Sequence, residues 1–180
     1  MIRRYFAVVL LTGLSLALSL DAGQDALPVL RKAPALTFHL PGGGEKTLSD
    51  FRGKILALEF IQTTCPHCQA ASHVMTKLQK ELGSRGFQAI DLAINTTSDE
   101  DINAFKQSQQ TDFLIGWIGL NEMGHFLNLT PGVRFVVPQM VLIDRKGDIR
   151  FQTPPLGSET ALVEDNLRQH VLSLLNEKSR

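Results

Sequence analysis

The two cysteines of this chain lie three positions apart, where a strand-like segment gives way to a helix-like one. Residues 55–61 are apolar except for Glu59, a pattern typical of a strand that is buried on both faces. From residue 66 to residue 82, apolar residues recur at intervals of three and four, which predicts a helix. We therefore expect Cys65 and Cys68 at a strand-to-helix turn, and this placement strongly restricts the fold.

A cysteine pair in this position is suited to thiol–disulfide exchange. Cys65 would lie at a helix N-terminus, where unpaired N–H groups and the helix dipole favour a thiolate. Pro66 suits the first helical position, because its missing N–H costs nothing there. His67 adds a donor or a positive charge beside the sulfur. Cys68, one turn further on, is expected to be more buried and to act as the resolving thiol.

Two other uses of the pair are weaker. A permanent disulfide usually closes a longer loop than this one. A metal site could combine the cysteines with His67 and His73, but the sequence has no second Cys-x-x-Cys or paired histidine motif to complete a tetrahedral set. We therefore expect no metal and no cofactor other than the Cys65–Cys68 disulfide itself.

The same segments resemble the thioredoxin superfamily. Residues 58–68 are similar to the active site of DsbA-type oxidases, including the acid six residues before the first cysteine. Residues 33–38, 47–54 and 137–147 resemble segments of the TlpA/ResA group of extracytoplasmic proteins, which is related to the AhpC/TSA redoxins. The resemblance spans about residues 33–178. It implies an α/β thioredoxin-like fold, with a central mixed β-sheet flanked by helices and an N-terminal β extension.

The resemblance also assigns roles to three residues outside the cysteine motif. Pro138 alone would be interpreted as a proline at the start of a strand, but the resemblance implies a cis-proline beside Cys65. Val137 before it matches the DsbA type, and its backbone would pair with an incoming peptide. Glu59 corresponds to a buried acid that moves a proton at Cys68 during exchange. The alternative for Glu59 is an ion pair with Lys54 or Lys77.

The remaining pattern alternates strands and helices, as in an α/β sandwich. Further strands are expected at residues 36–40, 46–48, 87–94, 139–144 and 148–152. Further helices are expected at residues 100–110 and 121–127, and Ser158 and Glu159 are expected to open the last helix.

The N-terminus indicates export. Arg3 and Arg4 precede an apolar stretch, so residues 1–22 are predicted to be a secretory signal peptide cut near Ala22. An uncleaved membrane anchor is the alternative. Residues 23–32 would be a tether and residues 33–178 one domain. A periplasmic or otherwise extracytoplasmic location follows, in a space where disulfides persist. The net charge is zero and no basic run is present, so nothing indicates nucleic-acid binding.

These observations predict a thiol–disulfide oxidoreductase that acts on exported proteins. The TlpA/ResA resemblance favours a reductant, while a stabilised Cys65 thiolate would favour a DsbA-like oxidase or isomerase. The expected partners are protein thiols or disulfides and a membrane protein that donates or accepts electrons.

Two rivals come from other classes. A peroxidase would share the fold, but Leu58 and Gln62 occupy the Pro and Thr positions of the peroxidatic motif. A copper-binding metallochaperone would use Cys65 and Cys68, with Met140 or a histidine.

Overall fold

The computed structural model describes residues 30–158, 160 and 162–177. The predicted signal peptide or anchor at residues 1–22 and most of the predicted tether lie outside the described residues. The strands are β1 (Arg31–Lys32), β2 (Thr37–Leu40), β3 (Gly44–Thr47), β4 (Ile55–Ile61), β5 (Phe87–Ala93), β6 (Leu114–Trp117), β7 (Gln139–Ile143) and β8 (Asp148–Gln152). The helices are α1 (Pro66–Leu82), α2 (Asp99–Ser108), α3 (Leu120–Phe126) and α4 (Glu164–Asn176), with short 3-10 helices at Leu48–Phe51 and Gly83–Arg85.

All eight strands form one mixed sheet, in the order β1-β8-β7-β4-β5-β6-β2-β3. β4 lies in its interior, parallel to β5 and antiparallel to β7. All seven residues of β4 are buried, as its apolar sequence predicted. The thioredoxin-like α/β fold is thereby confirmed, and β4 is the strand from which the cysteine loop departs.

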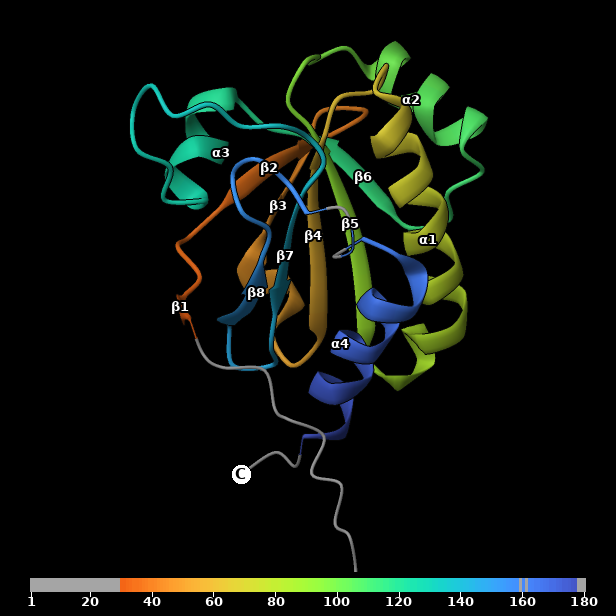
Figure 1. The fold of residues 1–180 in the computed structure, drawn as a ribbon. Helices are drawn as coiled ribbons and strands as arrows, with labels where there is room; N and C mark the ends of the chain where they lie inside the picture. The colour runs from red at the N-terminus through yellow and green to blue at the C-terminus, as the bar shows by residue number, and fades with distance from the viewer. Residues whose placement is uncertain (1–29, 159, 161, 178–180) are drawn as a thin grey trace, which may run out of the picture.

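Helices cover both faces of this sheet (Figure 1). Side chains of α1, α2 and α4 pack with alternate residues of β4 and β5 in one apolar cluster, which includes Met75, Phe105 and Val171. The other face packs against α3 and the N-terminal segment, in a cluster that includes Phe38 and Phe126. Strand residues 55, 57 and 61 therefore face α1 and α4, and Glu59 shares their face because strand side chains alternate.

The N-terminal β extension is present and reaches both edges of the sheet. β1 pairs with β8, whereas the β2–β3 hairpin joins β6 through the register of His39 with Trp117. The His39 and Trp117 rings stack there, with their centroids 4.0 Å apart. A Cβ atom at Gly116 would collide with the carbonyl oxygen of His39, so this crossing requires glycine.

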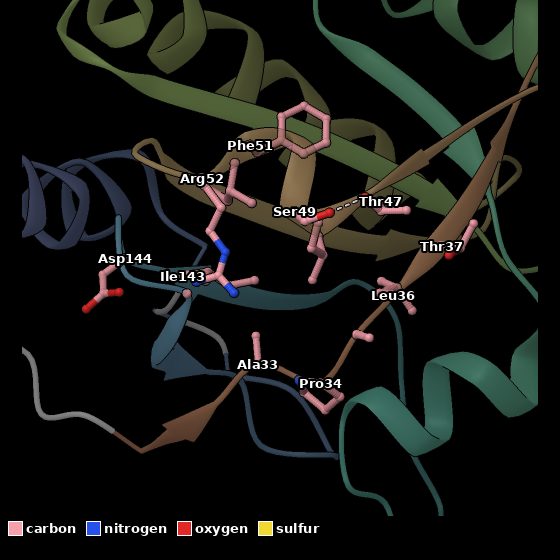
Figure 2. Close-up of a pocket in the computed structure, with 14 residues that line it drawn as sticks. Ala33, Pro34, Leu36, Thr37, Thr47, Ser49, Phe51, Arg52, Ile143 and Asp144 are labelled. Atoms are coloured by element: carbon pink, nitrogen blue, oxygen red, sulfur yellow. Dashed lines mark hydrogen bonds between the residues drawn. The ribbon is translucent and has the colours of Figure 1, made fainter.

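A cavity of about 280 Å³ lies under the extension (Figure 2). Its wall includes Leu36, Phe51, Leu56 and Ile143, so it lies at the start of β4, whereas the cysteines follow the end of that strand. Arg52 also lines the cavity, and its guanidinium donates to the carbonyl oxygen of Lys146 in the β7–β8 turn. The cavity is therefore remote from the dithiol.

The last helix begins later than the sequence predicted. α4 starts at Glu164 after Val163, and Ser158 lies before it in non-helical backbone, while Glu159 is outside the described residues. The preceding chain turns at Gly157, which has a φ of 80° and donates from its N–H to the Pro154 carbonyl at 2.8 Å. The prediction was wrong because a polar residue such as Ser158 is common in turns as well as at the start of helices, and here it follows a turn.

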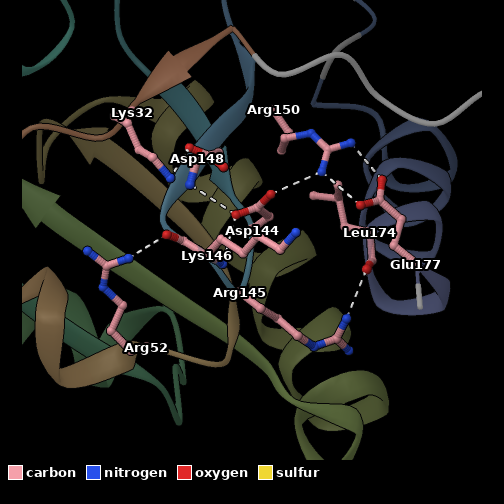
Figure 3. Close-up of polar contacts among 9 residues, drawn as sticks. All are labelled: Lys32, Arg52, Asp144, Arg145, Lys146, Asp148, Arg150, Leu174 and Glu177. Carbon is pink, nitrogen blue, oxygen red and sulfur yellow. Dashed lines mark hydrogen bonds and ion pairs between the residues drawn. The ribbon is translucent and has the colours of Figure 1, made fainter. Parts of the chain in front are cut away.

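A polar network fastens the β7–β8 hairpin to the end of α4 (Figure 3). Arg150 donates to Asp144 at 3.0 Å and to both oxygens of Glu177, at 2.8 and 2.6 Å. The second oxygen of Asp144 accepts from the backbone N–H groups of Lys146 and Asp148, each at 2.9 Å. Because the Arg150 and Asp144 side chains are only 7% and 10% exposed, each needs the other to offset its burial.

None of the helices within the described residues combines the length and the apolar character needed to cross a bilayer.

We expect Arg150→Met to lower the free energy of unfolding by about 3 kcal/mol, because it leaves a buried carboxylate without its partner. The matched control is Lys32→Met, which breaks the 2.6 Å pair with Asp148 at a site where Lys32 is 73% exposed. That change should cost less than about 1 kcal/mol. Urea unfolding of both variants checks the difference, and equal losses would contradict it.

Candidate functional site

The cysteine pair lies at the start of α1, as predicted. Cys65 is the residue before the helix, Pro66 occupies its first position, and Cys68 is in its first turn. The Cys68 backbone N–H donates to the Cys65 sulfur at 3.4 Å, and both thiols are free. Cys65 is half-buried, whereas Cys68 is fully buried. A partner can therefore reach the first sulfur but not the second.

The loop before Cys65 is held by side chains that the sequence analysis did not single out. Asn95, just after β5, accepts from the Thr63 backbone N–H at 3.0 Å and donates to the Thr63 hydroxyl at 3.1 Å. Gln69 on α1 donates to the Thr63 carbonyl at 3.2 Å. The signal was available for Asn95, because the ends of neighbouring parallel strands meet at one edge of a sheet.

The Val137–Pro138 bond is cis, as the family resemblance implied. The carbonyl oxygen of Val137 lies 3.9 Å from the Cys65 sulfur, so this loop is brought directly beside the accessible cysteine. Buried Gln139 fixes the loop, because its amide nitrogen donates to the carbonyls of Val136, Pro154 and Pro155 at 2.8 to 3.2 Å. No pattern in the sequence indicated this role for Gln139.

Glu59 is completely buried in the middle of β4, without the ion pair considered as an alternative. Lys54 instead donates to Gln88, and Lys77 pairs with Glu164. No donor among the described residues hydrogen-bonds to either carboxyl oxygen of Glu59, and the group within hydrogen-bonding reach of it is the Asp91 carboxyl. The ion-pair alternative is therefore wrong, because both lysines lie at the surface while Glu59 faces the core.

The neighbour of Glu59 is a second buried acid, Asp91, which is its register partner on β5. Burial, followed by the adjacent Asp91 carboxyl, raises the pKa of Glu59 well above its ordinary value. Burial also raises the pKa of Asp91, to about 7. The sequence analysis missed Asp91, although it interrupts the apolar run 89–93 of β5 as Glu59 interrupts that of β4.

Cys68 belongs to the same buried environment. Burial is the main cause that raises the pKa of its thiol, and contact with the Cys65 sulfur and the charge of Glu59 raise it further. Cys68 therefore holds its proton firmly unless a neighbouring group accepts it.

An apolar groove of about 690 Å³ opens beside this site. One wall comes from α1, with exposed His67 at its rim and Val74 inside, and the other from the Val137–Pro138 loop. Val136 and Leu156 line it while 45% and 71% exposed. Aliphatic side chains this exposed, next to a reactive sulfur, suit contact with an apolar segment of another molecule.

The chain matches the model of the AhpC/TSA family over residues 29–152. It is 24% identical over 159 residues to the thioredoxin-like protein YneN of Bacillus subtilis, covering 83% of this chain and 89% of that protein. The crystal structure of a thiol:disulfide interchange protein described as DsbE from Chlorobium tepidum is 25% identical, with a TM-score of 0.66. The match covers 83% of this chain and 99% of that one.

A likeness of fold extends to the thioredoxin domain of a thiol-disulfide oxidoreductase from Bacteroides vulgatus. It has a TM-score of 0.66 at 21% identity, and the match covers 83% of this chain and 99% of that one.

We expect Asp91→Asn to stabilise the protein progressively as the pH rises from about 4 to 7. In that window the folded wild type holds a proton on Asp91 that the unfolded chain releases, since the folded pKa is about 7 against an ordinary 3.8. The titration of Asp91 should therefore lower the free energy of unfolding of the wild type by up to about 1.4 kcal/mol per pH unit in this window. The variant has no carboxyl at this position, so this decrease should be absent. Urea unfolding across this range checks it; a pH-independent difference between the two proteins would contradict it.

Proposed function

We propose a reducing role outside the cytoplasm for this chain, which belongs to the AhpC/TSA family. It is a thiol–disulfide oxidoreductase of thioredoxin-like fold. In the proposed role its Cys65–Cys68 dithiol reduces disulfides of exported proteins, and a membrane electron donor restores the dithiol. The predicted signal segment at residues 1–22 supports the location.

The observation that carries the proposal is the unequal setting of the two sulfurs. Cys65 is accessible at the helix start, and Cys68 is buried behind it. As a thiolate, Cys65 attacks a substrate disulfide and releases one substrate thiolate, which takes a proton from solvent. Cys68 then loses its proton and attacks the Cys65 sulfur. The second substrate thiolate leaves, and the two electrons of the dithiol have passed to the substrate.

The surroundings of the sulfurs favour the reducing direction. A strong oxidant such as DsbA stabilises its reduced form. Among the described residues, the hydrogen bonds that the Cys65 sulfur accepts come from Cys68 alone, from its backbone N–H at 3.4 Å and from its thiol. Two buried acids lie in the same region, and the charge of Glu59 opposes a Cys68 thiolate. Weak stabilisation of the thiolates makes the dithiol a better electron donor.

The other candidate residues take supporting roles in this proposal. Pro66 shapes the first turn of α1, and His67, which is exposed, gives the Cys65 thiolate only a weak, solvent-screened stabilisation during exchange. The Val137 backbone pairs with the substrate beside Pro138, and the groove takes an apolar stretch of the substrate next to its cysteine. Glu59 receives the proton of Cys68.

The reduction potential of the cysteine pair tests the direction. Equilibration with glutathione and dithiothreitol buffers should give a value near or below that of thioredoxin, about −270 mV. A value near that of DsbA, on the order of −120 mV, would instead support an oxidase. Cys68→Ser is the control, because it cannot close the disulfide. Consumption of peroxide, or tight Cu(I) binding without any exchange, would favour the rival classes.

Val136→Asp should weaken the reduction of protein disulfides while sparing small ones. A charge in the groove opposes an apolar substrate segment, so kcat/KM for insulin should fall about tenfold, or about 1.4 kcal/mol. The rate with oxidised glutathione should stay within about twofold, because a small disulfide needs the sulfur but not the groove. Since Val136 is 45% exposed, the fold should tolerate the change. Parallel losses with both substrates would argue against docking in the groove.

A further inference from the structure

We propose that Asp91 is a second acid of the redox centre, which shares a proton with Glu59 and together with it accepts the proton of Cys68. This inference rests on the proposed function. It assigns Asp91 as a positioning residue that acts through Glu59, and Ser72 as the residue that orients Asp91.

The geometry of the sheet makes the two acids neighbours. Glu59 and Asp91 are register partners on parallel strands, and their side chains point to the same face because strand side chains alternate. Both residues are fully buried. Apart from each other's carboxyl, both oxygens of Glu59 and Oδ1 of Asp91 have no hydrogen-bond partner among the described residues. Two buried carboxyls with free oxygens side by side are most stable when one proton lies between them.

Ser72 explains why Asp91 points in the required direction. Its hydroxyl donates to Oδ2 of Asp91 at 2.6 Å, which leaves Oδ1 free. Ser72 follows Cys68 by four residues on α1, so both side chains leave the helix on the face that covers the sheet. The helix thus presents Cys68 and Ser72 to β4 and β5, where the register partners Glu59 and Asp91 lie.

The surroundings isolate the pair from other titratable groups of the described residues. β7 places Met140 opposite Glu59, and β6 places Ile115 opposite Asp91. α4 contributes Leu167 and Val171 to the same apolar cluster.

The titratable His170 of α4 lies against the Phe151 ring. The titratable groups that interact with Glu59 are then Asp91 and the two cysteines of α1. Among the described residues, Glu59 and Asp91 are therefore the buried acids placed to accept the proton of Cys68.

The proton balance during resolution then follows. With one proton between them, the two acids carry one negative charge. The S–H bond of Cys68 breaks and its proton passes to Glu59, so that both carboxyls become protonated. The new Cys65–Cys68 bond forms with the electron pair of the Cys68 sulfur, and the bond between Cys65 and the substrate breaks. The substrate thiolate leaves with two electrons, and the acid pair later returns one proton to solvent.

The resolving step can be isolated with an aromatic disulfide. When the reduced protein reacts with 5,5′-dithiobis(2-nitrobenzoic acid), the first thionitrobenzoate reports attack by Cys65 and the second reports resolution by Cys68. In the wild type the second rate should rise with pH through an inflection near 7, where the acid pair becomes able to accept a proton. The first rate reports Cys65 and serves as an internal reference.

Three variants test the assignment. Asp91→Asn should remove the inflection near pH 7 and slow resolution about tenfold at pH 8, because only Glu59 remains to accept the proton. Ser72→Ala should shift the inflection to higher pH, since the Ser72 hydrogen bond lowers the pKa of Asp91. Thr76→Ala is the matched control, because its hydroxyl donates to the Ser72 carbonyl at 2.9 Å and not to the acids; its profile should match the wild type.

The outcomes separate this inference from the proposed function. Profiles of Asp91→Asn and Ser72→Ala that coincide with the wild type would overturn the role of Asp91 while leaving the exchange activity intact. A wild type that releases no second thionitrobenzoate would overturn the proposed function itself. A merely structural role does not predict these two different effects. Asp91→Asn removes the inflection, whereas Ser72→Ala shifts it to higher pH.

Discussion

The burial of β4 between β5 and β7 is the constraint on which the rest of the structure depends. With neighbours on both sides and helices on both faces, β4 has all seven residues in the interior. The strand therefore fixes where its chain emerges, and the cysteine loop begins at that point. It also forces Glu59 into the solvent-inaccessible interior, where burial raises the pKa of its carboxyl. The packing of β4 thus determines both where Cys65 lies and the pKa of the Glu59 carboxyl.

Local pattern was enough to predict the parts of the fold that are set by neighbouring residues. The strand at residues 55–61, the helix that begins at Pro66 and the hairpin of β7 and β8 follow from periodicity and turn chemistry. The partnership of Glu59 with Asp91 follows from the register of two strands that are about thirty residues apart, which no single segment encodes. The anchors Asn95 and Gln139 depend in the same way on loops that meet only in the folded chain. The cis bond at Pro138 came from family resemblance, since a proline before a strand is ordinarily trans.

Two buried charged clusters within the described residues differ in kind. In the first cluster, Arg150 forms ion pairs with Asp144 and Glu177, so the opposite charges offset one another. This network links α4 to the β7–β8 hairpin. Glu59 and Asp91 have the same sign and leave three oxygens unpartnered among the described residues. The first arrangement serves the fold, because removal of a partner costs stability. The second costs stability at neutral pH, and such a cost is typical of sites kept for chemistry.

The N-terminal extension has a consequence for recognition. The two edge strands of the sheet are β1, which is only two residues long, and β3, which carries the polar sequence Gly-Glu-Lys-Thr. Neither edge presents a long apolar strand with which an incoming chain could pair. β-augmentation, in which a ligand peptide adds a strand to a sheet edge, is therefore disfavoured here. The same short or polar edge strands discourage edge-to-edge aggregation between sheets. Recognition is left to the end of the sheet, where the loops lie, and selectivity must come from side-chain contacts there.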